Sequence, residues 1–244
     1  MMMQATRAKP REPWDERLIQ GVLKVAKPFR GAAPAQIAAL AQQCHCLEVP
    51  RGAGVVAKGA RLPGVFAVAH GTVKLSLRRQ AGEERVVRLV QAGQCFGEPS
   101  ALLGKPSGLE AAAVTDCKLV VIPAAAIFAH IDRDPRCARE VVLALAERAV
   151  ELLAELESSS MRRGSQRLAS YLDSLVLPAE GNGNCVVRLP ATKTVVASRL
   201  GMKKETLSRL LRSFAEQGLI QVAQREIRIL DRARLGTLGS AAAC

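Results

Sequence analysis

Between residues 136 and 157 the chain runs for 22 residues without a glycine or a proline. Pro135 stands directly before this run, and proline suits the first turn of a helix. The run therefore predicts a single helix about 35 Å long, well above the average for globular proteins. The sequence differs on its two sides, with short β-prone segments before it and basic, helical sequence after it.

A row of side chains, all but one apolar, recurs along this predicted helix at spacings close to a heptad repeat. Its members are Val141, Leu145, Arg148, Leu152 and Leu156. Either a second copy of the chain or the chain's own β-rich part would cover such a row, and the pattern alone favours neither. We assign residues 135–160 to a candidate dimerisation helix and predict a hinge at Ser158-Ser159-Ser160.

Ahead of the long helix, short β-prone segments alternate with glycines. The clearest are Val65 to Ala69, Val73 to Leu77, Val86 to Val90 and Lys118 to Ile122. Evenly spaced strands with glycine turns predict a small β-barrel or roll, and Gly71 and Gly82 fall where a hairpin needs positive φ. Residues 34–134, which begin with a short amphipathic helix, are assigned to this sensor domain. Residues 1–33 are assigned to an N-terminal arm and helix.

The sequence from residue 161 to residue 244 predicts a winged helix-turn-helix. A helix covering Val195 to Leu200, capped by Thr192, is followed by Gly201 and by a second helix from about Lys203 to Gln217. Two short strands, Leu219 to Val222 and Ile227 to Leu230, then form a wing. Apolar residues in the second helix recur at helical spacing and predict its buried face. They are Leu207, Leu210, Leu211 and Phe214.

The opposite face of that helix carries side chains that suit double-stranded DNA. Arg209 can grip guanine O6 and N7, Glu205 can accept from cytosine N4, and Ser208 can serve either partner. The side chains that suit phosphates are Lys203, Lys204, Thr206 and Arg212. The alternative is that Glu205 and Arg209 only form a surface ion pair one helical turn apart.

Charge favours a polyanionic partner. Residues 161–244 hold 14 basic and six acidic side chains, and so carry eight of the thirteen net positive charges. Contacts from Lys and Arg to phosphates release counterions and strengthen binding to nucleic acid, although an acidic membrane surface would also attract them. No stretch approaches the roughly 20 apolar residues that cross a bilayer, and the N-terminus lacks a signal-peptide core. We expect a cytoplasmic protein that is not an enzyme, because the sequence has neither a nucleophile elbow nor a phosphate loop.

Taken together, these motifs resemble the CRP/FNR family of bacterial transcription regulators over most of the chain. The run Glu205-Thr206-Leu207-Ser208-Arg209 is similar to the Glu-x-x-Ser-Arg of the family's FNR branch. Gly71 and the run from Gly93 to Glu98 resemble its cyclic-nucleotide-type β-roll. The resemblance implies an α+β fold that joins this roll, a long dimerisation helix and a C-terminal winged helix-turn-helix.

The same resemblance implies a homodimer on a TTGAT-like inverted repeat, with RNA polymerase as a further partner. A palindromic site requires a two-fold dimer, which favours the pairing role of the seam on the long helix. The effector pocket is expected at Phe96, Gly97 and Glu98.

The controlling signal is constrained by what the sequence lacks. Cyclic-nucleotide members of the family place an Arg after the Gly-Glu pair, but residues 99–115 contain none, and Glu110 stands near the phosphate position. We therefore expect no cyclic AMP. Oxygen sensors of the FNR branch hold an iron–sulfur cluster on N-terminal cysteines, which residues 1–43 lack. Four later cysteines remain that could converge, namely Cys44, Cys46, Cys95 and Cys117.

The chain is most similar to the DNR subgroup of denitrification regulators, which respond to nitric oxide. This resemblance implies haem as the cofactor. His45, His70 and His130 are the candidate ligands, and the alternative for each is a half-buried strand or turn residue. A thiol-redox sensor is the remaining alternative, because Cys44 and Cys46 lie near Arg51, which would stabilise a thiolate.

Overall fold

The computed structural model describes residues 13–26, 29, 31–78, 84–161, 163–176 and 185–240. The chain forms two compact units, one of residues 1–83 and 87–148 and the other of residues 84–86 and 149–244. No helix in the described ranges is both long and apolar enough to cross a membrane.

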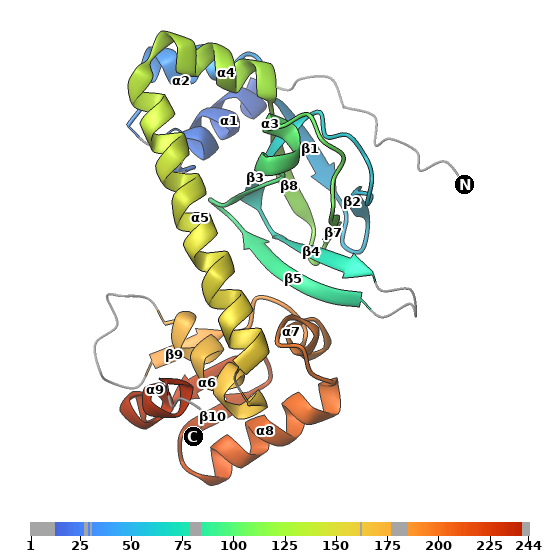
Figure 1. Ribbon diagram of the computed structural model, residues 1–244, viewed down its shortest axis with the longest axis vertical. Coiled ribbons are helices and arrows are strands. Elements are labelled where there is room, and N and C mark those ends of the chain that lie inside the picture. The colour runs from blue at the N-terminus through green and yellow to red at the C-terminus, as the bar shows by residue number, and fades with distance from the viewer. Residues whose placement is uncertain are drawn as a thin grey trace. The chain divides into compact units, whose positions relative to one another are not determined.

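Two four-stranded sheets form the centre of the first unit (Figure 1), in the orders β1-β8-β3-β6 and β2-β7-β4-β5. The prediction of a β-roll is confirmed. The strands are β1 (His45–Val49), β2 (Gly54–Val56), β3 (Gly64–His70), β4 (Thr72–Arg78), β5 (Glu84–Gln91), β6 (Cys95–Phe96), β7 (Glu110–Ala113) and β8 (Cys117–Pro123).

Strand β8 links two hydrophobic cores. Leu119 and Val121 belong to the core that strands of both sheets share, whereas Val120 and Ile122 belong to a second core beneath helices. Successive side chains of a strand point to opposite faces. Because both faces of this strand are buried, its sequence is a continuous apolar run and does not alternate.

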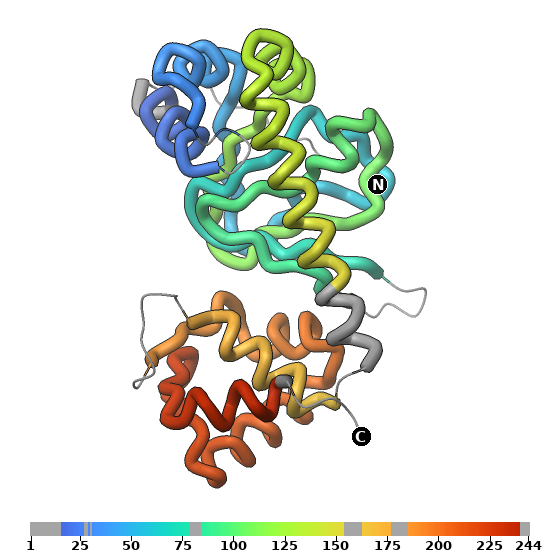
Figure 2. The backbone as a smooth tube through the Cα atoms, turned by 60° about the vertical axis from the view of Figure 1, so that its left-hand side comes forward, coloured from blue at the N-terminus to red at the C-terminus, as the bar shows by residue number. Residues whose placement is uncertain are grey.

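Helices cover the outer face of the sheet that contains β8. They are α1 (Pro13–Val25), α2 (Pro34–Ala41), α4 (Ala124–Arg133) and the beginning of α5 (Pro135–Met161), with the short α3 (Glu98–Leu102) after β6. Figure 2 shows α1, α2 and α4 gathered at one end of this unit. The sequence predicts α1 and α2 near their observed positions, but not α3 or α4.

Gly71 joins β3 to β4. Its φ is 90°, and a Cβ there would lie 2.7 Å from Cys117 Sγ, so only glycine fits this turn. The predicted need for positive φ is confirmed at this position, whereas Gly82 lies outside the described residues.

The long helix differs from its prediction at its C-terminal end. It continues to Met161, so the hinge predicted at residues 158–160 is wrong. Serine costs a helix only a few tenths of a kcal/mol, roughly, and three in a row do not end one. Val141 is 9% exposed and belongs to the helix-covered core of its own unit. The core of its own unit therefore already covers most of this side chain, and its role in a dimer seam stays a prediction.

The other seam positions have different surroundings. Leu145 and Arg148 line a cavity of the first unit, although Leu145 remains 40% exposed. Leu152 is 41% exposed, and the side chain of Leu156 lies outside the described part of the chain. Among the large apolar side chains of α5 that the structure describes, Val142, Val150 and Leu153 are the most exposed, at 63%, 66% and 66%.

The second unit combines helices with a three-stranded sheet of order β10-β11-β9. Its elements are the end of α5, α6 (Gly164–Ser174), β9 (Cys185–Arg188), α7 (Lys193–Arg199), α8 (Lys204–Glu216), β10 (Ile220–Ala223), β11 (Glu226–Ile229) and α9 (Arg232–Ser240). The predicted helix-turn-helix and wing are confirmed. Helix α9 was not predicted. It packs on α6, where Arg232 Nε pairs with Asp173 Oδ1 at 2.9 Å.

Replacing Gly239 by alanine should weaken this packing. A Cβ at Gly239 would lie 2.8 Å from Ser170 Oγ and 3.1 Å from the Ser170 nitrogen. Such overpacking typically costs about 1–3 kcal/mol. Gly236 on the same helix is the matched control, since a Cβ there meets nothing within 4 Å. Urea denaturation should show a loss for Gly239→Ala and none for Gly236→Ala. Equal effects would mean that the contact with α6 is not tight.

Candidate nucleic-acid interface

A glycine turn sets the geometry between α7 and α8. Gly201 has φ of 63°, and the amides of Gly201 and Met202 donate to the carbonyls of Ser198 and Ala197 at 3.1 and 3.0 Å. Thr192 is the N-cap residue of α7, as predicted, but its side chain makes no capping hydrogen bond. Arg167 of α6 donates from Nε to the Leu200 carbonyl at 2.8 Å, which braces the turn. Sequence reasoning missed this brace.

Helix α8 has one buried and one exposed face. Leu207, Leu211 and Phe214 are at most 3% exposed, whereas Leu210 is only half-buried. All three predicted base-reading residues, Glu205, Ser208 and Arg209, are exposed and lie one helical turn or less apart. Of the predicted phosphate contacts, Lys203, Lys204 and Arg212 are exposed and Thr206 is half-buried.

No ion pair joins Glu205 to Arg209 among the described residues. The alternative interpretation of these two side chains, as a surface ion pair, therefore has no support in the structure. Both remain available for a ligand.

The wing adds two basic side chains that sequence reasoning did not select. Gln224, a non-glycine residue with positive φ (54°), lies in the turn between β10 and β11. Arg188 of β9 lies opposite Glu226 of β11 in the strand register, and Arg228 lies two residues further along β11. Both arginines are exposed, so they share the solvent face of this sheet. Polar and apolar residues alternate along Glu226-Ile227-Arg228-Ile229, which could have revealed Arg228, whereas β9 does not alternate and gave no such signal for Arg188.

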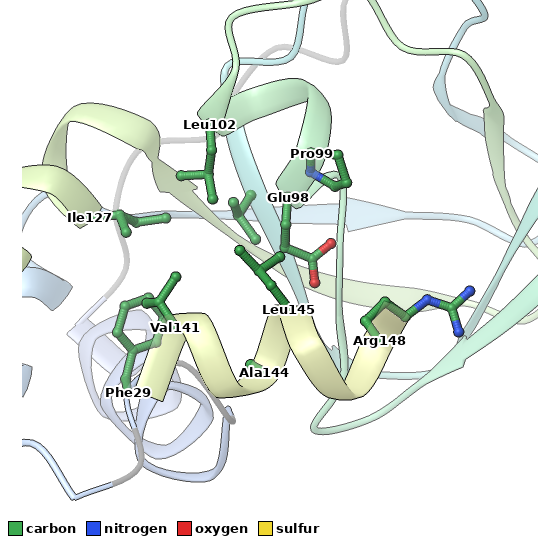
Figure 3. A pocket seen from close by; sticks show the side chains of 10 residues that line it. Phe29, Glu98, Pro99, Leu102, Ile127, Val141, Ala144, Leu145 and Arg148 are labelled. Atoms are coloured by element: carbon green, nitrogen blue, oxygen red, sulfur yellow. The ribbon is translucent and has the colours of Figure 1, made fainter. Parts of the chain in front are cut away.

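In the first unit, the three residues predicted for the effector pocket are not brought together. Phe96 is 2% exposed and stacks on Phe66, with ring centroids 5.0 Å apart, so it is a core residue. Gly97 has φ of 86°, and a Cβ there would lie 2.6 Å from Leu62 Cδ2. Glu98 alone lines a cavity (Figure 3).

This cavity has a volume of about 50 Å³. Its lining consists of Phe29, Val65, Glu98, Pro99, Leu102, Ile127, Val141, Ala144, Leu145 and Arg148. Burial raises the pKa of the Glu98 carboxyl, and the guanidinium groups of Arg88 and Arg148 oppose this effect. The cavity is thus largely apolar with one ionisable end.

The segment that the family resemblance places near a nucleotide phosphate makes internal contacts. Glu110 accepts a hydrogen bond from Arg78 Nε at 2.9 Å, and Ser107 Oγ donates to the Leu109 carbonyl at 2.7 Å. An acidic side chain here disfavours a phosphate.

The four cysteines considered for an iron–sulfur cluster do not converge. Cys46 and Cys95 share one row of the sheet but are separated by β8 and β3, where Val120 and Ala67 stand between them. Cys117 belongs to the opposite core. No group of three possible metal ligands occurs in the described ranges. Burial also raises the pKa of Cys95 to about 12 and that of Cys137 to about 11, which opposes a reactive thiolate.

The three histidines also lie apart. In the strand register, His45 of β1 lies opposite Val121 of β8, and His70 of β3 lies opposite Lys118 of β8. Strands β1 and β3 flank β8 on opposite sides. His130 is buried in α4 with its Nε2 unpartnered, 6.3 Å from the Phe29 ring between centroids. None of them lines the cavity, whose 50 Å³ is far below the roughly 300–1,000 Å³ of sites for larger ligands. The described residues therefore do not fit haem.

The chain matches two protein families, each over one of these regions. Residues 46–134 match the cyclic nucleotide-binding domain, and residues 166–238 match the Crp-like helix-turn-helix domain.

Similarity to known regulators extends along most of the chain. The chain is 26% identical over 216 residues to the CRP-like cAMP-activated global transcriptional regulator of Mycobacterium tuberculosis. The aligned region covers 88% of this chain and 96% of that protein. The chain is 29% identical over 226 residues to the nitrogen fixation regulation protein FixK of Azorhizobium caulinodans, covering 86% and 87%. A solved transcriptional regulator of the CRP/FNR family from Thermus thermophilus is similar with a TM-score of 0.63 and 25% identity, covering 82% of this chain and 100% of the other.

Proposed function

We propose that the chain is a DNA-binding transcription regulator of the CRP/FNR type, which binds a TTGAT-like inverted repeat as a homodimer. One observation supports this most directly: Glu205, Ser208 and Arg209 are exposed together on one face of α8. In a major groove these side chains match the donors and acceptors of G·C and A·T pairs.

Phosphate contacts would fix the orientation of α8 on the duplex. Lys203, Lys204 and Arg212 supply charge beside the reading face, and Thr206 supplies a hydroxyl. Arg188 and Arg228 extend the basic surface onto the wing. RNA polymerase is the further partner that we propose for a regulator of this kind.

Dimerisation is proposed through α5. A two-fold DNA site calls for a two-fold protein, and the exposed apolar side chains of α5 would be covered by the same helix of a second copy. The side chains that would contact the second copy are Val142, Leu152 and Leu153, with Leu145 at the margin of the contact.

We further propose that a ligand in the first unit controls DNA binding. Cyclic AMP is disfavoured by Glu110 and by the absence of an arginine from residues 99–115. The resemblance to the DNR subgroup predicts nitric oxide, acting through haem, as the signal. A haemin titration of the protein tests this prediction.

Fluorescence anisotropy with a labelled duplex tests the DNA-binding proposal. The protein should bind a TTGAT palindrome at least about 10³-fold more tightly than a scrambled duplex of equal length. The logarithm of its affinity should fall linearly with the logarithm of salt concentration. Equal affinity for both duplexes would contradict base reading by α8.

A further inference from the structure

The turn between α7 and α8 decides where the base-reading side chains of α8 lie. Helix α8 begins at Lys204, soon after the turn residue Gly201, so a shift of the turn moves Glu205, Ser208 and Arg209 together. Side chains of a binding site must stay within about 0.5 Å of their productive positions. The contacts that hold this turn therefore bear on how well α8 discriminates between bases.

Two backbone hydrogen bonds close the end of α7 in a Schellman motif. The Gly201 amide donates to the Ser198 carbonyl at 3.1 Å, and the Met202 amide donates to the Ala197 carbonyl at 3.0 Å. Neither bond uses the carbonyl of Leu200, the C-cap residue of α7. Because both bonds are local, they fix the shape of the turn but do not tie it to the neighbouring helices.

Helix α6 contacts the turn at two points. Arg167 Nε donates to the Leu200 carbonyl at 2.8 Å and so satisfies the group that the motif leaves over. A Cβ on Gly164 would lie 3.7 Å from Met202 Cε and 3.5 Å from Leu210 Cδ1, which are ordinary contact distances. Residues three positions apart share one face of a helix. The turn and α8 therefore rest on the same face of α6.

Helix α6 is a firm support for these contacts. Leu168, Ala169 and Leu172 are at most 1% exposed, and Asp173 forms the ion pair with Arg232 of α9. The guanidinium on this helix also lies at the C-terminus of α7, where the helix dipole favours a positive charge. The hydrogen bond to the turn thus joins it to a helix that is anchored in the core of its unit.

We infer that Arg167 is a positioning residue for base reading, because its bond to the Leu200 carbonyl holds α8 in the one orientation that fits the bases. The inference rests on the proposed function and adds a specificity determinant outside α8. Without this bond the turn would populate several orientations, and only the competent fraction of molecules would bind the palindrome tightly. Non-specific binding depends on charge, so it would change much less.

Two substitutions separate the hydrogen bond from the charge. Arg167→Gln places an amide nitrogen at the same position along the side chain as the arginine Nε, so it keeps a donor and loses the charge. Arg167→Met has a similar length and no donor. In anisotropy titrations, Arg167→Met should lower the ratio of affinities for palindromic and scrambled DNA about tenfold, as the loss of one charge-assisted hydrogen bond predicts. Arg167→Gln should keep most of the parent's ratio.

Other roles of Arg167 predict different results. If its guanidinium bound a phosphate, both variants would lose affinity equally for both duplexes, with a salt slope reduced by about 1. Arg212→Met removes a charge that we assign to phosphate, so it is the matched control for that behaviour. If Arg167 only stabilised the fold, Arg167→Met would melt at a lower temperature with an unchanged affinity ratio. Either result would overturn the inference.

Hydrogen exchange of the intact chain, measured by mass spectrometry, tests the bond without DNA. The segment that contains the Gly201 and Met202 amides should exchange faster in Arg167→Met than in the parent, and at the parent's rate in Arg167→Gln. Equal exchange in all three proteins would contradict the inference. A parent protein that binds both duplexes equally would refute the proposed function, whereas an unchanged affinity ratio in Arg167→Met refutes only the positioning role.

Discussion

Replacing Arg209 by alanine is expected to weaken binding to a TTGAT palindrome by about 1–3 kcal/mol, or roughly fivefold to 150-fold. Arg209 is exposed on α8 and has no ion pair with Glu205, so its guanidinium is available for two parallel hydrogen bonds to one guanine. Arg209→Lys should recover only part of the loss, because lysine is a point charge without the planar fork. Anisotropy titrations against palindromes with one altered base pair measure the effect.

Lys204→Ala provides the matched control on the same helix. It removes one positive charge, as Arg209→Ala does, but from a side chain that we assign to phosphate. The loss should therefore be similar for every duplex, with a salt slope reduced by about 1. If Arg209→Ala also lowered affinity equally for palindromic and scrambled DNA, Arg209 would be a phosphate contact and the proposed base reading would be wrong.

Leu153→Arg is expected to produce a monomer that binds the palindrome poorly. Leu153 is 66% exposed on α5, and a charge at this position would have to be buried unpaired between two helices. Light scattering coupled to size-exclusion chromatography should give half the parent mass. Loss of the second half-site should also weaken DNA binding by several orders of magnitude, since each subunit contributes its own contacts.

Leu103→Arg is the control for this prediction. Leu103 is equally exposed, at 66%, but lies at the end of α3 and outside α5. It should remain dimeric. A dimeric Leu153→Arg would place the subunit interface elsewhere, and a monomeric Leu103→Arg would extend it to α3.

The winged helix-turn-helix was predictable because its signals are local. Leu207, Leu211 and Phe214 recur at helical spacing, so the buried face of α8 follows from periodicity, and the exposed face follows by exclusion. Gly201 marks the turn for the same reason, since its positive φ is a property of one residue. The β-roll was predictable on similar grounds from regularly spaced apolar segments and glycines.

The partners of these segments were not predictable, because they depend on contacts between distant residues. A heptad-like spacing says that Val141 is buried but not by what, and here its own unit covers it. Likewise, only the strand register shows that Cys46 and Cys95 stand on one row with two strands between them. The pKa of the Glu98 carboxyl is raised mainly by burial, in a cavity whose lining includes residues as far along the chain as Phe29 and Val141.

The anchoring of the start of α5 in the core of its own unit has a consequence for assembly. Because Val141 is already covered within one chain, each chain can fold before it meets another, and pairing is then a separate bimolecular step. While dimers are scarce, the concentration of dimers able to occupy a palindrome would rise with the square of monomer concentration. The amount of protein that a cell makes would thus act as an input to this regulator in its own right, alongside any ligand.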